Sequence, residues 1–208
     1  MICHKEKIKN LKGFLDDEEA ARIYEIALKA SGLGHPCLEI GSYCGKSAIC
    51  MGAACKKRGG VLFSVDHHKG SEEQQPGEEY FDPELFDPRH FSVNTLEYFR
   101  KTIKDFDLED TIIPIVAESG VAGRMWATRL SLLFIDGGHS YETALADYST
   151  WAGHIMPKGY LLVHDIFKDS ASGGQAPRQI YQMALSSGLF TELPMTKTLG
   201  VLKRKTGA

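Results

Sequence analysis

Short apolar segments alternate along the chain with longer segments in which apolar residues recur at helical spacing. The short segments are predicted strands and lie at 36–41, 59–66, 111–118, 130–138 and 156–165. The longer segments are predicted helices and lie at 16–32, 46–58, 95–106, 119–129, 141–155 and 176–188. Strands that alternate with helices build βαβ units, so the pattern predicts an α/β protein around a mostly parallel sheet.

Two further apolar segments, 189–194 and 199–205, follow near the end of the sequence. They are too close together for a crossover helix, so they must pair as an antiparallel hairpin at one edge of the sheet. The predicted fold class is therefore α/β, a doubly wound and mostly parallel seven-stranded sheet with a C-terminal antiparallel hairpin. We expect a single domain over residues 1–208, which begins with a helical segment at 1–34.

Segment 67–91 interrupts this alternation, since it is acidic, contains three prolines and carries Tyr80, Phe81 and Phe86. Loops of this length inside a compact domain usually cover a functional site or are disordered. The segment follows the end of a strand, at the edge where open α/β sheets bind ligands. Because solvated linkers rarely need aromatic residues, the sequence favours a lid on the substrate side over a flexible insertion.

The composition narrows the range of partners. The 208 residues carry a net charge of −3, which gives no electrostatic basis for binding nucleic acid or an anionic membrane. No apolar segment approaches the ~20 residues of a membrane-spanning helix, and the first residues lack the apolar core of a signal peptide. The five cysteines form no CxxC pair, so free thiols in a reducing compartment are the favoured interpretation. We therefore expect a cytoplasmic protein.

Gly41 and Gly45 mark the turn from the first strand into its helix, and the turn ends in Gly-Lys-Ser. A P-loop needs four residues between its first glycine and the Gly-Lys pair, whereas three residues separate these two glycines. Asp66 ends the next strand, about twenty residues after Gly45, where an acid hydrogen-bonds the ribose of a nucleoside cofactor. The turn therefore indicates a dinucleotide or S-adenosylmethionine, and its departure from GxGxxG counts against the dinucleotide.

Several motifs in order resemble class I S-adenosylmethionine-dependent methyltransferases: "LEIGSYCGKSA", "LFSVDHH", "IPIVAES", "LLFIDGGHSYETALADYSTWAGHIMPKGYLLVHDIF" and the closing hairpin. The resemblance is closest to the small-molecule O-methyltransferase branch whose fourth strand ends in "DGGHSY" and whose fifth ends in "HD". It covers nearly all of the chain after about residue 35. It implies a Rossmann-like methyltransferase fold, with the last strand between the fifth and sixth, and methyl transfer to an oxygen of a small-molecule acceptor.

The resemblance also implies which residues hold S-adenosylmethionine. Gly41 and Gly45 match the turn at its amino-acid end, Asp66 matches the ribose-binding acid, and Asp136 ends the fourth strand beside it. Further implied contacts are Glu39, Ser42 and Ser47 at the amino-acid end, His67 beside the adenine, and Glu118 and Ser119 at the adenine edge. Glu118 is interpreted equally well as an acid at a helix N-terminus.

A divalent cation is implied less directly. In the metal-dependent O-methyltransferases two aspartates at the places of Asp136 and Asp165 bind Mg²⁺ or Ca²⁺, and the metal lowers the pKa of a substrate hydroxyl. An asparagine follows the second aspartate there, whereas Ile166 stands here. His164 offers a compensating ligand, although imidazole favours transition metals. Metal dependence is left open at this point.

His139 lies three residues after Asp136, where the catechol type has its catalytic lysine, and imidazole is a suitable general base near neutral pH. We expect these two residues to be catalytic, although His139 is also interpreted as a cap of the following helix.

Two other functions stay open. One is a catalytically silent or regulatory nucleoside-binding protein of the same fold, and the other is a hydroxylase or another non-methylating branch. Partners beyond the small-molecule acceptor are expected to be limited to a second copy of the chain, since the N-terminal helix and the lid are natural surfaces for a homodimer.

Overall fold

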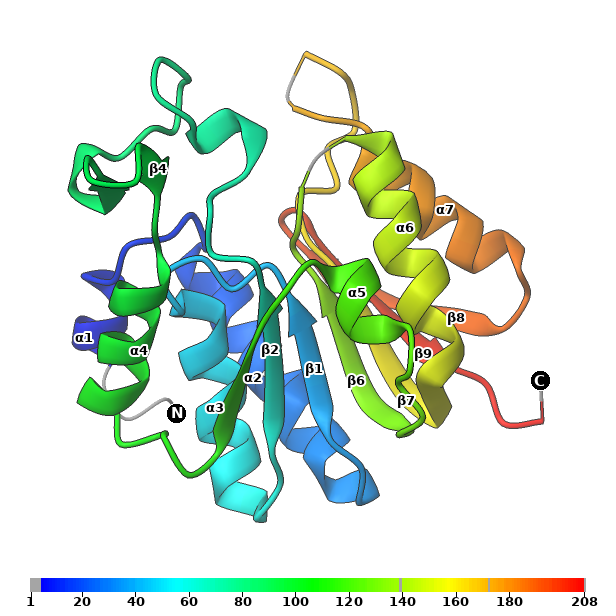
Figure 1. Cartoon of the computed structure of the whole chain (residues 1–208). Coiled ribbons are helices and arrows are strands. Elements are labelled where there is room, and N and C mark those ends of the chain that lie inside the picture. The colour runs from blue at the N-terminus through cyan, green and yellow to red at the C-terminus, as the bar shows by residue number, and fades with distance from the viewer. Residues whose placement is uncertain (1–4, 139, 172, 208) are drawn as a thin grey trace.

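The structure is a computed structural model, and it describes residues 5–138, 140–171 and 173–207. Within these ranges a seven-stranded sheet has the order β5-β2-β1-β6-β7-β9-β8 (Figure 1). Its strands are β1 (Cys37–Ile40), β2 (Leu62–Asp66), β5 (Ile112–Val116), β6 (Leu130–Ile135), β7 (Ile155–Val163), β8 (Phe190–Thr196) and β9 (Leu199–Arg204). β9 pairs antiparallel with both of its neighbours and the other pairings are parallel. This confirms the predicted fold class. The last strand, β9, lies between β7 and β8, which are the fifth and sixth predicted strands.

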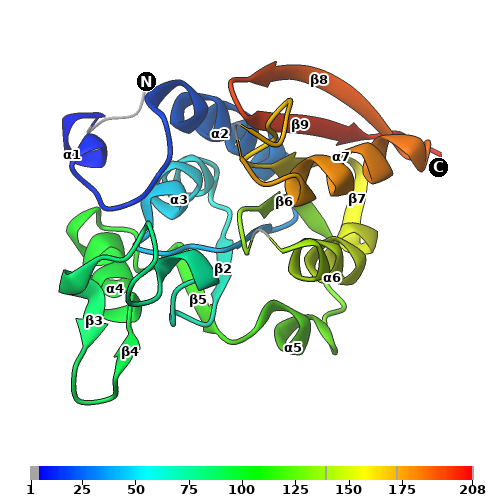
Figure 2. The same cartoon turned by 90° about the horizontal axis from the view of Figure 1, so that it is seen from above.

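Helices cover both faces of the sheet, as Figure 2 shows from above. On one face lie α2 (Asp17–Ala30), α3 (Lys46–Arg58) and α4 (Leu96–Asp105), and on the other lie α5 (Ser119–Gly123), α6 (Tyr141–Trp151) and α7 (Ala176–Ser186). β6 is buried along its whole length. Leu130, Leu133 and Ile135 enter one apolar core, and Leu132 and Phe134 enter the other. A strand covered on both faces needs such a predominantly apolar sequence.

Among the described residues, the longest helix is too short and too polar to cross a membrane. A short helix, α1 (Lys5–Lys9), precedes α2 within the N-terminal segment. The N-terminus of α2 is fixed by Asp16, whose side chain accepts a hydrogen bond from the Glu18 N–H at 2.7 Å. This is the usual way to satisfy a free N–H group in a first helical turn.

The helix predicted over 119–129 is wrong in its length, because α5 ends at Gly123. A Cβ on Gly123 would lie 2.1 Å from Cγ2 of Thr150, so α5 packs against α6 without a side chain between them. The chain then leaves the helix, and Trp126 packs edge-on against Phe63 and Trp151 with ring centroids 5.0 and 5.1 Å apart. Tertiary packing therefore overrides the local helical pattern here.

Segment 67–91 contains two 3-10 helices and the strand β3 (Phe86–Asp87), which pairs antiparallel with β4 (Ser92–Val93) just after the segment. It rises above the sheet edge at which β1 and β2 end (Figure 1). Leu85 and Val93 pack against Cys44 of the glycine turn. The segment, called the lid below, thus packs directly beside the glycine turn, and its role as a cover on the substrate side stays a prediction.

Gly41 has a structural role that no other residue fits. Its φ is +84°, and a Cβ there would lie 2.1 Å from the Asp136 carbonyl oxygen. L-residues rarely adopt such a φ, so both the backbone conformation and the space require glycine.

We expect Gly41→Ala to lower the free energy of unfolding by roughly 2–4 kcal/mol, because the substitution adds a clash to a strained φ. Urea denaturation measures this directly. Gly32→Ala is the matched control, since a Cβ at Gly32 meets nothing within 4 Å, and it should change stability by at most about 1 kcal/mol. Equal effects of the two substitutions would contradict the steric argument.

Candidate active site at the carboxyl edge of the sheet

The carboxyl ends of four neighbouring strands bring the predicted site residues together. Gly41 N–H donates to the Val65 carbonyl at 3.0 Å, Asp136 N–H donates to the Ile40 carbonyl at 2.9 Å, and His164 N–H donates to the Ile135 carbonyl at 3.1 Å. These bonds continue the sheet by one residue at each strand end. Gly41, Asp66, Asp136 and the pair 164–165 therefore lie at one edge, as parallel strands require.

Asp66 anchors the glycine turn. One carboxylate oxygen accepts hydrogen bonds from the N–H groups of Ser42 at 2.9 Å and Tyr43 at 2.8 Å, and the other accepts from the N–H of His68 at 2.7 Å. The Ser42 hydroxyl also faces this carboxylate, at 3.4 Å, and is buried. Asp66 therefore shapes the turn as well as ending β2 at the position expected to bind ribose.

Backbone strain gathers at this edge. Tyr43, His68 and Asp165 have φ angles of 46°, 59° and 56°, in the left-handed region that costs a non-glycine residue ~1–3 kcal/mol. Tyr43 lies in the glycine turn, and His68 and Asp165 each stand two residues after the end of a strand. Strain of this kind is typical of functional sites, where surrounding contacts hold a residue in an unfavourable conformation.

Glu39 is enclosed beneath the glycine turn. Its carboxyl group accepts hydrogen bonds from the Ser47 hydroxyl at 2.9 Å and from the Ser64 hydroxyl at 2.5 Å, and none of its surface is exposed. Burial raises the pKa of Glu39 to about 8, against the opposing effect of the two hydroxyls. Glu39 and Ser47 thus contact each other under the turn, and direct contact of either with a cofactor remains a prediction.

His164 links two carboxylates at the centre of the edge. Its Nδ1 lies 2.9 Å from Oδ1 of Asp136, and its Nε2 lies 3.0 Å from Oε2 of Glu19, which belongs to α2. Oδ2 of Asp165 lies 3.5 Å from Nδ1. Burial alone would lower the pKa of His164, but the carboxylates of Asp136, Glu19 and Asp165 raise it well above its usual range.

Candidate metal ligands meet here as well, since atoms of Asp136, His164 and Asp165 all lie within 4.8 Å of one another. The two aspartates offer the hard oxygen ligands that Mg²⁺ and Ca²⁺ prefer. A metal-binding imidazole must be neutral with a free lone pair, whereas both nitrogens of His164 face carboxylates. The donor set therefore fits a hard divalent cation at the aspartates, with His164 as a partner of Asp136.

The other predicted residues are spread around the edge. His139 lies outside the described residues, and the cap of α6 is Ser140, whose hydroxyl accepts from the Thr143 N–H at 3.2 Å. His67 is partly exposed at the start of the lid, where its Nδ1 accepts from the Lys69 N–H at 3.0 Å.

The two residues expected at the adenine edge are placed differently. Glu118 is exposed at the N-terminal end of α5 and makes no side-chain cap there. The Ser119 hydroxyl accepts a hydrogen bond from the Trp151 indole N–H at 2.8 Å, so it faces α6. A contact of either residue with adenine stays a prediction.

A strap of residues 10–16, between α1 and α2, ties the lid to the glycine turn. Lys12 Nζ lies 2.5 Å from Oδ2 of Asp82 and 2.7 Å from Oε2 of Glu84, both in the lid. Its ammonium group also lies 5.3 Å from the centre of the Tyr98 ring. Two carboxylates and one aromatic ring thus hold the same cation.

Aromatic contacts join the same three segments. Phe14 of the strap packs against Tyr43 of the glycine turn and Tyr80 of the lid, with ring centroids 5.7 and 5.1 Å apart. Lys46 Nζ donates to the Gly13 carbonyl at 3.3 Å and so fixes the strap to the start of α3. The strap, the lid and the turn therefore form one connected rim.

Sequence reasoning did not single out Glu19, Lys12 or Ser64. Glu19 stands in an acidic run that reads as a favourable helix start, and Lys12 stands in an ordinary polar loop. Ser64 is a polar residue in the interior of the otherwise apolar strand β2, a signal that could have marked it.

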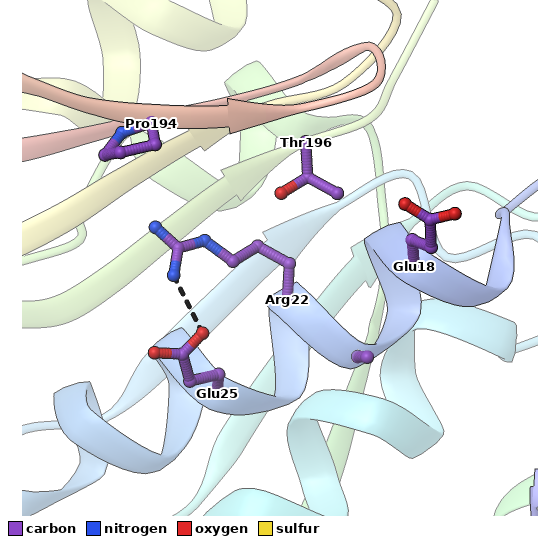
Figure 3. Close-up of a pocket in the computed structure, with 6 residues that line it drawn as sticks. Glu18, Arg22, Glu25, Pro194 and Thr196 are labelled. Atoms are coloured by element: carbon purple, nitrogen blue, oxygen red, sulfur yellow. Dashed lines mark hydrogen bonds and ion pairs between the residues drawn. The ribbon is translucent and has the colours of Figure 1, made fainter.

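A separate groove of about 400 Å³ lies between α2 and β8, lined by Glu18, Ala21, Arg22, Glu25, Pro194 and Thr196 (Figure 3). Arg22 lies across it and donates to Glu25 at 2.7 Å. No predicted site residue lines this groove.

Glu39→Gln tests the buried carboxyl group through the pH dependence of stability. The folded-state pKa of Glu39 is raised, so the folded protein holds this proton when the unfolded chain has lost it. Wild-type stability should therefore fall relative to the variant as pH rises from 4.5 to about 8, by up to about 1.4 kcal/mol per pH unit. Urea denaturation across this range measures the difference. Parallel curves would contradict the assignment, and Glu109→Gln, at an exposed position, is the control.

Lys12→Met tests the rim. Removal of the ammonium group leaves Asp82 and Glu84 without their shared cation, and such a pair contributes up to about 1 kcal/mol. Amide hydrogen exchange in residues 80–86 should therefore become roughly fivefold faster. Lys101→Met removes an exposed pair with Asp105 and should leave that exchange unchanged. Unchanged exchange in Lys12→Met would show that the lid is held by other contacts.

This chain is similar to known methyltransferases. A family model described as a methyltransferase domain matches residues 38–166, which is more than half of the chain. That range contains the glycine turn, the lid and the ends of β1, β2, β6 and β7.

Solved structures of methyltransferases share the fold. The O-methyltransferase NovP superposes with a TM-score of 0.69 at 13% identity, over 91% of this chain and 81% of NovP. The SAH-bound Podospora anserina methyltransferase PaMTH1 gives 0.66 at 13% identity, over 98% of this chain and 86% of its own. The Bacillus cereus O-methyltransferase in complex with SAH superposes with a TM-score of 0.65 at 11% identity, over 97% of this chain and 90% of the Bacillus cereus chain.

At these identities the likeness to solved structures establishes the fold, and the family model establishes the relationship. The resemblance of the sequence to class I S-adenosylmethionine-dependent O-methyltransferases is confirmed. The chain belongs to the methyltransferase-domain family.

Proposed function

We propose that this protein transfers the methyl group of S-adenosylmethionine to an oxygen nucleophile of a small molecule. The observation that carries the proposal is the convergence of the glycine turn, Asp66 and Asp136 at one edge of a methyltransferase-family fold. Similar folds bind SAH in PaMTH1 and in the Bacillus cereus enzyme, and NovP is named as an O-methyltransferase.

The cofactor would lie along this edge. Gly41 and Gly45 hold the turn in its left-handed conformation at this edge, since both have positive φ angles. Asp66 would bind the ribose hydroxyls, because a carboxylate oxygen can accept more than one hydrogen bond. Glu39, Ser42 and Ser47 would support the amino-acid end, and His67, Glu118 and Ser119 the adenine end.

Methyl transfer is an in-line displacement, so alignment of two bound reactants supplies most of the catalysis. The carbon–sulfur bond of the sulfonium breaks as the carbon–oxygen bond forms, and the acceptor proton moves to a base. His139 is the proposed base, since it follows Asp136 by three residues. A divalent cation at Asp136 and Asp165, when bound, would lower the pKa of the acceptor hydroxyl.

The remaining expectations concern the cellular setting. Four described cysteines, Cys37, Cys44, Cys50 and Cys55, are buried free thiols, which supports a cytoplasmic location. The acceptor is the proposed small-molecule partner, and the N-terminal helix and the lid are the proposed contacts with a second copy of the chain.

A catalytically silent nucleoside-binding protein of the same fold is the alternative. It has no need for the cluster of Asp136, His164 and Asp165, which favours the enzyme. A silent protein would bind the nucleoside and transfer no methyl group, so binding and turnover must be measured separately.

Calorimetric titration with S-adenosylhomocysteine (SAH) tests cofactor binding. We expect micromolar affinity for SAH, no binding of Mg-ATP, and at least tenfold weaker SAH binding in Asp66→Ala, which loses both the ribose acid and the anchor of the turn. His139→Ala should bind SAH as the wild type does. In methyl transfer to hydroxylated aromatic acceptors, with and without EDTA, His139→Ala should lose most turnover.

Asp110→Ala changes an exposed acid two residues before the start of β5 and is the control for Asp66→Ala. Binding of Mg-ATP without SAH would refute the proposal and support a phosphate-binding turn. Binding of SAH with no transfer to any acceptor would favour the silent protein. Full turnover by His139→Ala would refute only the assignment of His139 as the base.

A further inference from the structure

Glu19 is a buried acid that lies outside the segment matched by the family model. It stands in the first turn of α2 and is 3% exposed. One of its oxygens accepts from the Thr198 N–H at 2.9 Å and from the Thr198 hydroxyl at 2.8 Å. The other faces Nε2 of His164 at 3.0 Å. A buried carboxylate is stable only with such partners, so the position of Glu19 is set by both contacts.

The His164 ring transmits this position to Asp136. An imidazole ring is planar and rigid, so fixing one nitrogen fixes the direction in which the other points. With Nε2 held at Glu19, Nδ1 points at Oδ1 of Asp136, 2.9 Å away. The Phe134 ring lies edge-on to His164, with centroids 6.3 Å apart, and limits its tilt. The three side chains thus form a continuous chain from α2 to the end of β6.

We infer that Glu19 is a positioning residue that orients the Asp136 carboxylate through His164. Its effect on methyl transfer rests on the proposed function, whereas the hydrogen-bonded chain itself does not. Glu19 acts by holding the ring, because the structure places His164 between it and Asp136. Loss of a residue that orients a ligand-binding side chain typically changes affinity or activity by about 10–100-fold.

Variants of the two contacts separate positioning from general support of the fold. Glu19→Ala removes both contacts. Glu19→Gln keeps them, because its carbonyl oxygen can accept from Thr198 while its amide group donates to Nε2 and leaves the proton on Nδ1 for Asp136. Thr198→Val removes the hydroxyl contact and leaves the His164 contact in place. Glu18→Gln, next to Glu19 and exposed, is the neutral control.

The test is a ¹⁵N–¹H spectrum of the histidine rings in labelled protein. The His164 signal is assigned by its absence from the spectrum of His164→Gln. We expect a slowly exchanging Nδ1 proton in the wild type, Glu18→Gln, Thr198→Val and Glu19→Gln, and its loss in Glu19→Ala. SAH affinity should fall about tenfold in Glu19→Ala and be largely restored in Glu19→Gln. The melting temperature should fall in both Glu19→Ala and Thr198→Val.

Persistence of the Nδ1 proton in Glu19→Ala would overturn the inference. So would its loss in Thr198→Val, since the effect would then follow loosening of the fold. Loss of the Nδ1 proton signal in Glu19→Gln would also overturn the inference, because this variant keeps both hydrogen bonds of Glu19. If the wild type does not bind SAH, the proposed function fails, while the spectra still decide the role of Glu19.

Discussion

The close approach of the backbone at Gly41 to the backbone at Asp136 is the constraint on which the site depends. A Cβ on Gly41 would overlap the Asp136 carbonyl group, so the chain after β1 must turn at once in a left-handed conformation. That turn presents the N–H groups of Ser42 and Tyr43 to Asp66. The same approach sets where the Asp136 backbone lies, and with it the reach of its side chain to His164. The glycine turn, Asp66 and Asp136 are therefore parts of one arrangement.

The acids at this edge differ because their partners differ. Glu39 and Glu19 are both buried, and burial alone would raise the pKa of each. Glu39 meets two serine hydroxyls, and its pKa rises to about 8. Glu19 meets His164 and Thr198, which hold its pKa at about 2. Depth in the protein does not decide the charge of a buried acid, whereas an imidazole at hydrogen-bond distance does.

Residues outside the matched family segment complete the edge. Lys12 and Phe14 join the lid to the glycine turn, and Glu19 reaches His164 from the first turn of α2. Segments of this kind vary on a common fold, and function is set by the groups that they bring to the site.

The sequence by itself determined the order of the strands and helices, because apolar periodicity and turn residues act between near neighbours. It placed Gly41, Asp66, Asp136 and Asp165 at one edge, since the carboxyl ends of neighbouring parallel strands share an edge. It could not end α5 at Gly123, because that end depends on Thr150 of another helix. Nor could it pair Glu19 with His164, which lie 145 positions apart. Only the tertiary structure decides the partner of a buried charge, because that partner is chosen by packing and not by neighbours in the chain.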